Sequence, residues 1–250
     1  MKMGVATVKI LFTKFINDMK KIHRNLLFIL TFALLVSCED FMDVHEKYIE
    51  DGEIIYAPKV DSIEFIAGQE RILFRFWLYN SPNVKFVNLF WNDDQDSLVV
   101  PVSPTTGLDS MDVLLPDMAE KSYTFNVYTV DKYGHNSLKE TDFGSSYGDV
   151  FKSSLANRRI KDVSITDKGG SISWYSAAEN LIGNEVRYET NNGEKAVVRM
   201  SSAENEVLCP DAKTSSTFEY RSLFIPEKLS IDTFAVEWSA YETPFPAIYK

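Results

Sequence analysis

From Pro58 onward, short apolar runs alternate with clusters of turn-forming residues. Runs of this length with period-two alternation are typical of strands, and their regular spacing predicts an all-β protein built from sandwiches. The Asn192-Gly193 pair, between two alternating runs, predicts a type I′ hairpin. The expected strands are 62–67, 71–79, 85–91, 97–102, 110–115 and 123–131, then 160–166, 171–176, 185–190, 194–200, 205–208, 217–224 and 233–238.

The two halves of this pattern share a repeated motif. The sequence Asp-Val-Leu-Leu-Pro-Asp at 112–117 parallels Glu-Val-Leu-Cys-Pro-Asp at 206–211, and an aromatic strand follows each copy. Repeats of this kind predict two tandem sandwiches, which we place at residues 58–143 and 160–250 with a linker at 144–159. A strand ending in Leu-Pro before an aromatic strand resembles fibronectin type III domains. Tyr123 is the candidate for their tyrosine corner, although it lies further past Pro116 than is usual.

The run at 71–79 supplies the best candidate for a binding surface. Alternation places Phe76 in the core, at the position that Trp174 fills in the second repeat, so that Arg75, Trp77 and Tyr79 face outward. An exposed aromatic strip suits the C–H faces of sugar rings. The alternative is that Trp77 covers a sheet edge or packs on the N-terminal tether or on the second domain. Trp91 and Trp238, at strand ends, are expected to be packing residues.

The N-terminal region has the organisation of an export signal. Lys20, Lys21 and Arg24 precede an 11-residue apolar run that ends at Val36, and Ser37-Cys38 follows. A basic region, a short apolar region and a small residue before the cleavage site predict a signal peptide over residues 1–37. The run is too short for a membrane span, which needs about 20 residues. Met19 is the expected true start, because Met19-Lys20-Lys21 is a normal opening for such a peptide.

The cysteine at the end of this segment resembles a bacterial lipobox. That resemblance implies that Cys38 carries lipid and becomes the first residue of the mature protein; the alternatives are an ordinary signal peptide or a buried helix. Residues 38–57 are acidic and are expected to form a tether. Acidic residues directly after the lipid-bearing cysteine resemble the surface-export signal of Bacteroidetes lipoproteins, which implies an outer-membrane location facing the cell exterior.

Charge narrows the choice of partners. The chain has 26 basic and 36 acidic residues; six and one of them lie in residues 1–37, so the remainder carries a net charge of −15. This acidity argues against nucleic acid, which needs a basic surface. With Cys38 lipidated, Cys209 has no partner for an intrachain disulfide and is expected to be a buried small hydrophobe.

We expect neither an enzyme nor a cofactor. The sequence contains no P-loop and no histidine–cysteine cluster. Asn92, Asp94 and Asp96 gather oxygen ligands in a turn and form a weak candidate for a calcium site. An EF-type calcium loop, however, has glycine at its sixth position, where this sequence has Ser97. The simpler interpretation is a solvated acidic turn.

Three stretches resemble an uncharacterised family of Bacteroidetes lipoproteins, a domain of unknown function: residues 52–61, Tyr147-Gly148 with 157–160, and 220–226 with 231–234. Members sit beside outer-membrane glycan-import systems, often ahead of a carbohydrate-binding-like domain that this chain does not show. The resemblance implies a non-catalytic surface lipoprotein that binds polysaccharide or serves a glycan-import complex as a spacer. The alternative is a structural or adhesive module that binds another protein.

Overall fold

The computed structural model describes residues 19–23 and 55–247. The chain divides into two units at residues 55 and 56, and the described residues 19–23 of the first unit are helical. Cys38 lies outside the described residues, as do most of the expected signal peptide and tether. Among the described residues, no helix has the length and apolarity needed to cross a membrane.

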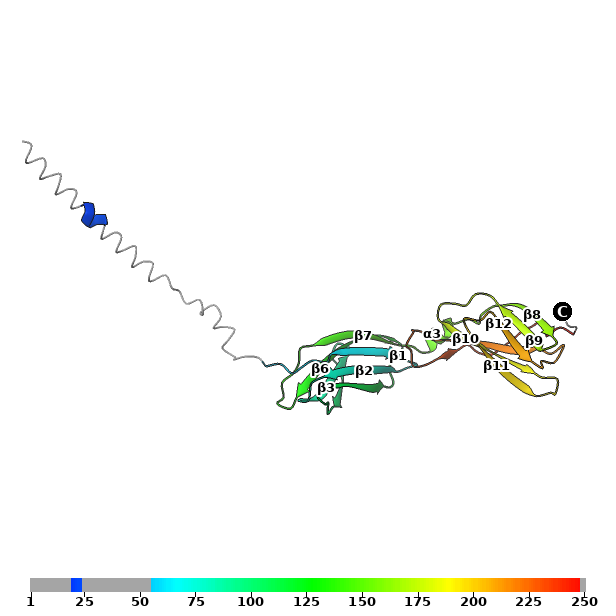
Figure 1. The fold of residues 1–250 in the computed structure, drawn as a ribbon, viewed down its shortest axis with the longest axis horizontal. Helices are drawn as coiled ribbons and strands as arrows, with labels where there is room; N and C mark the ends of the chain where they lie inside the picture. Colours follow the sequence, from blue (N-terminus) through cyan, green and yellow to red (C-terminus); the bar gives the residue numbers. More distant parts are fainter. Residues whose placement is uncertain (1–18, 24–54, 248–250) are drawn as a thin grey trace, which may run out of the picture. The chain divides into compact units, whose positions relative to one another are not determined.

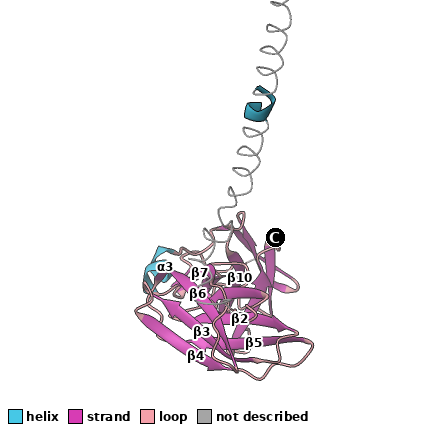
Figure 2. Ribbon diagram, turned by 90° about the vertical axis from the view of Figure 1, so that its left-hand side faces the viewer, coloured by secondary structure: helices cyan, strands magenta, loops and turns pink. Residues whose placement is uncertain are grey.

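The first seven strands form a sandwich of two antiparallel sheets, coloured cyan to green in Figure 1. One sheet has the order β1-β2-β5 and the other β4-β3-β6-β7. The figures show β2 beside β5 in the first sheet and β3 beside β4 in the second (Figure 2). The strands are β1 (Ser62–Ala67), β2 (Ile72–Tyr79), β3 (Val84–Trp91), β4 (Asp96–Pro101), β5 (Leu108–Leu115), β6 (Lys121–Asp131) and β7 (Glu140–Ser146).

Stacked phenylalanines join the two sheets of the first sandwich. The ring of Phe65 in β1 lies 4.9 Å from that of Phe74 in β2 and 4.0 Å from that of Phe125 in the opposite sheet, nearly parallel to both. All three side chains are buried. Aromatic side chains bury large apolar areas, and stacked pairs add to that gain. This stack therefore forms the centre of the first core.

The second sandwich repeats this arrangement. Its sheets have the orders β12-β9-β8 and β11-β10-β13-β14, and β15 also pairs with β13. The last strand is expected as one run over residues 233–238, but the structure has one two-residue strand within that range and a second directly after it. The elements are α3 (Asp149–Ser154), β8 (Ile160–Thr166), β9 (Gly169–Trp174), β10 (Leu181–Glu189), β11 (Lys195–Ser201), β12 (Glu206–Pro210), β13 (Phe218–Phe224), β14 (Phe234–Ala235) and β15 (Ser239–Ala240).

Strand register confirms that the two sandwiches are tandem copies. Leu115 pairs with Ile72 in the first, and Cys209 pairs with Gly170 in the second, each directly before the motif's proline. Counting along β2 and β9 from these pairs makes Phe76 and Trp174 equivalent, and both are buried in their cores. The aspartate after each proline, Asp117 and Asp211, has the same φ of +55°. The repeated motif therefore encodes the same backbone turn twice.

The tyrosine corner is present in the first sandwich. The Tyr123 hydroxyl donates a hydrogen bond of 2.9 Å to the carbonyl of Ala119, four residues upstream, as such corners do. The longer spacing from Pro116 thus does not prevent the bond. In the second sandwich Phe218 stands at the corresponding place and has no hydroxyl. There the buried Tyr188 of β10 donates to the carbonyl of Pro210.

Several elements differ from the sequence-based expectation. The segment expected as linker contains the end of β7 and the helix α3, and no strand was predicted for residues 140–146. Gly144 faces Phe65 so closely that a Cβ atom would lie 2.5 Å from the phenylalanine Cβ. The type I′ assignment at Asn192-Gly193 is wrong. Of these two residues only Gly193 has a positive φ, whereas type I′ needs two, and this fits a turn that ends in a glycine bulge.

The residues between α3 and β8 are held by buried polar contacts. Arg158 is only 5% exposed. Its guanidinium donates hydrogen bonds to the carbonyls of Tyr175 and Glu204 and to the side-chain oxygen of Asn205. Asn157 accepts a hydrogen bond from the backbone of Ser222. Buried polar groups are tolerated when they are paired in this way. These contacts fix the entry of the chain into the second sandwich.

A phenylalanine near the C-terminus completes the second core. Gly170 occupies the position that Ile72 fills in the first sandwich, and Phe245 lies against the place where its side chain would be. The ring of Phe245 is fully buried and packs 5.0 Å from that of Phe218. The ring of Phe245, from a distant segment of the chain, thus fills the core space that the glycine in β9 leaves empty.

We expect Phe245→Ala to destabilise the second sandwich by about 3–5 kcal/mol, as large-to-small changes in cores do. Urea unfolding followed by tryptophan fluorescence measures the loss. The matched control is Phe143→Ala, which removes a phenylalanine that is 69% exposed and should change stability by about 0.5 kcal/mol or less. Equal effects of the two substitutions would contradict the assigned role of Phe245.

An ion pair joins loops of the two sandwiches. Arg71 donates from Nε to Asp232 Oδ2 at 2.8 Å and from its terminal nitrogen to Oδ1 at 2.5 Å, and the backbone N–H of Gln69 donates to Oδ2 at 2.8 Å. The N–H of Ile231 adds a bond to the carbonyl of Ala67. The hydrogen bonds from Arg71 hold the pKa of Asp232 below its usual value. Burial of the carboxylate acts in the opposite direction but has the smaller effect. Charge-assisted bidentate pairs of this kind define orientation as well as adding stability.

Because the pKa of Asp232 is lowered by folding, its contribution is present above the usual carboxylate pKa of about 4 and is lost as the pH falls below it. We expect Asp232→Asn to weaken this contact by about 1–2 kcal/mol at neutral pH. NMR relaxation checks this: the sandwiches of the variant should tumble more independently, and wild type should approach that behaviour on acidification. Asp167→Asn, at an exposed turn carboxylate, is the control; if both variants behave like wild type, the contact is not a restraint.

Candidate functional site

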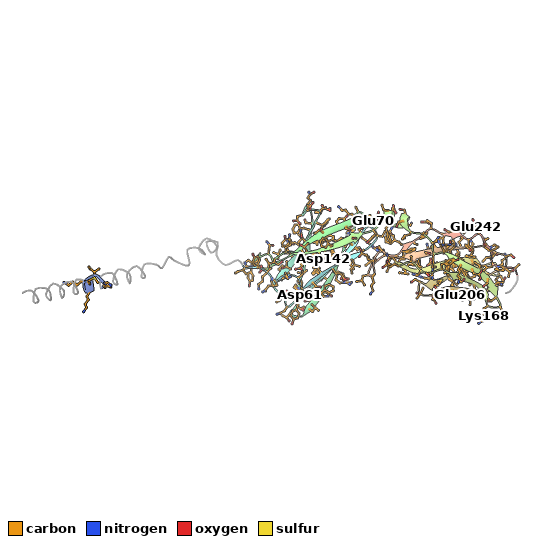
Figure 3. The ribbon with its side chains drawn as sticks, turned by 90° about the horizontal axis from the view of Figure 1, so that it is seen from above. Asp61, Glu70, Asp142, Lys168, Glu206 and Glu242 are labelled. Atoms are coloured by element: carbon orange, nitrogen blue, oxygen red, sulfur yellow. The ribbon has the colours of Figure 1, made fainter. Side chains whose placement is uncertain are left out.

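The outward face of β2 carries the aromatic strip. Phe74, Phe76 and Leu78 are buried, while Trp77 is partly exposed and Tyr79 is 61% exposed. The register places Ser62 of β1 and Ser110 of β5 on either side of Trp77. Both cross-strand neighbours of the indole are therefore small and polar. The strip is held at its end by Asp61, labelled in Figure 3, whose carboxylate accepts a 2.5 Å hydrogen bond from the N–H of Tyr79.

Arg75 on the same face is fully engaged with acidic neighbours. It donates from Nε and a terminal nitrogen to the two oxygens of Asp112, at 2.7 and 2.8 Å, and lies 3.6 Å from Glu64. The hydrogen bond from Arg75 lowers the pKa of Asp112. Both acids flank Arg75 in the register, one on each neighbouring strand. Arg75 therefore positions two carboxylates beside Trp77 and is not a free cation for an anionic ligand.

The acidic turn between β3 and β4 is tied up by internal bonds. The Asn92 amide donates to Asp96 at 2.6 Å, its oxygen accepts from the ammonium of Lys121 at 2.9 Å, and Asp94 accepts from Asn126 at 2.8 Å. Within residues 19–23 and 55–247, no group of three or more histidine, cysteine, aspartate or glutamate side chains is arranged to hold a metal ion. A lysine ammonium at Asn92 opposes a bound cation, so the arrangement fits the interpretation as a solvated turn.

A cavity that the sequence reasoning missed lies on the outer face of the other sheet. It has a volume of about 300 Å³ and is lined by Asn88 and Phe90 of β3, Asp94, Tyr128 of β6 and Asn136 of the β6–β7 loop. The rings of Phe90 and Tyr128 meet edge to face, 5.9 Å apart at 83°. The available signal was the alternation along β3, where Asn88 and Phe90 point away from the buried Val87 and Leu89.

Trp238 belongs to a charged network on the second sandwich. Its indole lies between two guanidinium groups, 4.4 Å from that of Arg187 and 4.6 Å from that of Arg221. These arginines pair in turn with Glu219 and Glu185. Trp238 lies between β14 and β15 in the sequence, and its contacts with the two arginines make it a packing residue.

The thiol of Cys209 is buried in the second core, where desolvation raises its pKa to about 12. Because the thiolate is the reactive form of cysteine, this thiol is inert at neutral pH. Cys38, the proposed site of lipid attachment, lies outside the described residues.

Comparison with known proteins places this arrangement in a family. The family model DUF4998, described as a domain of unknown function, matches residues 38–234. The chain belongs to DUF4998. The expected membership in a family of unknown function is therefore confirmed. No curated protein matches the chain.

Solved structures that resemble this DUF4998 protein contain fibronectin type III domains. The FN1–FN3 domains of chicken CNTN1 match at 14% identity with a TM-score of 0.42, covering 76% of this chain and 66% of that one. A two-domain fibronectin type III segment of chicken tenascin matches at 14% identity with a TM-score of 0.30, covering 74% of this chain and 98% of the segment. The strand orders described above, and not these distant matches, confirm the expected pair of fibronectin type III-like sandwiches.

Proposed function

We propose that this protein is a lipid-anchored, non-catalytic module of the outer cell surface that serves glycan acquisition. The single observation that carries the proposal is the partly exposed indole of Trp77. It stands on the outward strand face between Ser62 and Ser110, next to carboxylates that Arg75 holds in place. An aromatic face beside fixed hydrogen-bonding groups has the chemistry that recognises a sugar ring.

The proposed anchor rests on the N-terminal sequence. The basic residues, the apolar run and Cys38 stand in the order of a lipoprotein signal, and the family match begins at Cys38. Lipid on this cysteine attaches the protein to the outer membrane, and the acidic residues that follow suit display toward the exterior. A single acyl chain binds a membrane only marginally, so stable attachment needs more than one chain.

Counting thiols tests the anchor. In protein taken from membranes, a lipid-modified Cys38 offers no thiol and Cys209 is buried, so we expect no reaction with a thiol reagent in the native state. After denaturation we expect one thiol per chain, and none in the Cys209→Ala variant. Two thiols after denaturation would show that Cys38 is unmodified and that the signal is an ordinary one.

Trp77→Ala tests the binding surface. We expect it to weaken the binding of the full chain to a polysaccharide about tenfold, since stacking on the indole is worth about one kcal/mol or more. A glycan array finds the polysaccharide, and titration calorimetry measures the affinity.

The matched control for this test is Leu114→Ala, which removes an exposed side chain on the outward face of β5. It should leave affinity unchanged. Unfolding midpoints of both variants separate loss of binding from loss of structure. Failure of wild type to bind any glycan tested would overturn the proposal.

A second candidate is a structural or adhesive module that binds another protein. The observation that favours it is the edge strand β7, which carries Phe143 at 69% exposure. Edge strands offer backbone groups for pairing with an added strand. For this candidate, Phe143→Asp removes cross-linking to a partner protein on cells, while Trp77→Ala leaves it unchanged.

A further inference from the structure

The cavity on the outer face of the four-stranded sheet offers a second binding site. We propose that it binds one unit of a neutral sugar chain. This inference deepens the proposed function and rests on it, but it concerns different residues on the opposite sheet of the first sandwich. A volume of about 300 Å³ lies at the lower end of the range for small-molecule sites.

The lining has the chemistry of a site for hydroxyl groups. Two amides, Asn88 and Asn136, supply both donors and acceptors, and Asp94 supplies acceptors. A sugar hydroxyl is itself both donor and acceptor, so it pairs with either kind of group. The lining holds no lysine or arginine, which argues against an anionic ligand. The rings of Phe90 and Tyr128 supply the apolar surface that the C–H groups of a sugar need.

The site is held in shape before any ligand binds. Thr141 donates to Asn126 at 2.8 Å, and Asn126 donates to Asp94 at 2.8 Å, so a chain of hydrogen bonds orients the carboxylate. On the other side, the carbonyl of Asn136 accepts from the N–H of Ala57, which fixes the loop that carries it. A preorganised site loses less entropy when a ligand binds.

One polar atom at the site is left without a partner. Asn88 Oδ1 is withdrawn from solvent and makes no hydrogen bond in the structure. An atom so withdrawn is out of reach of a ligand in the cavity, so recognition there comes from the two rings and the exposed polar atoms of the lining.

The test measures the binding of neutral hexasaccharides of glucose, xylose and mannose to the full chain by saturation-transfer NMR and calorimetry. We expect binding to weaken about tenfold in Asn88→Ala and in Tyr128→Ala, a change equivalent to about 1.4 kcal/mol. Thr124→Ala, on the same face of β6 but outside the cavity lining, should bind like wild type. Because Tyr128→Ala also removes packing, Asn88→Asp provides a variant of nearly the same shape.

The outcomes distinguish the two sites. If Trp77→Ala weakens binding while the Asn88 and Tyr128 variants do not, the proposed function stands and this inference fails. If the cavity variants weaken binding and Trp77→Ala does not, the inference stands and the assignment of the Trp77 face fails. Binding of choline but of no sugar would overturn the inference in favour of an organic cation held by Asp94 and the two rings.

Discussion

The alternation of inward and outward side chains along each strand is the constraint on which the structure depends. In β2 it sends Phe74 and Phe76 into the core, and it must then send Arg75 and Trp77 to the surface. A shift of register by one residue would exchange the two sets, burying an arginine and exposing the phenylalanines. The aromatic stack of Phe65, Phe74 and Phe125 prevents that shift. Packing inside the sandwich thus decides which residues are available outside it.

Much of the fold follows from the sequence because this alternation is visible in it. The strands at 62–67 and 160–166 have the bounds that the pattern predicts. β7 escaped prediction because its inward positions include Gly144 and Ser146, small residues that leave room for the large ring of Phe65. Its sequence therefore looks like a linker. A strand therefore shows a weaker apolar pattern where side chains of neighbouring strands already fill the core space in front of it.

The candidate sites were less predictable than the fold, since they depend on which strands are neighbours. Alternation alone identifies Trp77 as outward, but the serines that lie beside it belong to β1 and β5. Predicting the cavity requires still more knowledge of which strands are neighbours. Asn88 and Tyr128 are 40 residues apart in the sequence and become partners only because β3 pairs with β6. The loop with Asn136 then comes from beyond β6.

The two sandwiches are built alike but differ where function is proposed. On the outer face of its larger sheet, the second sandwich carries Arg187, Arg221 and their glutamate partners around Trp238. The first carries aromatic rings and amides on the corresponding face, with a cavity between them. Paired charges satisfy one another, whereas the first sandwich presents two rings and two amides around its cavity. This difference is why the proposed recognition is placed on the first sandwich, while the second contributes Asp232 to the contact with Arg71.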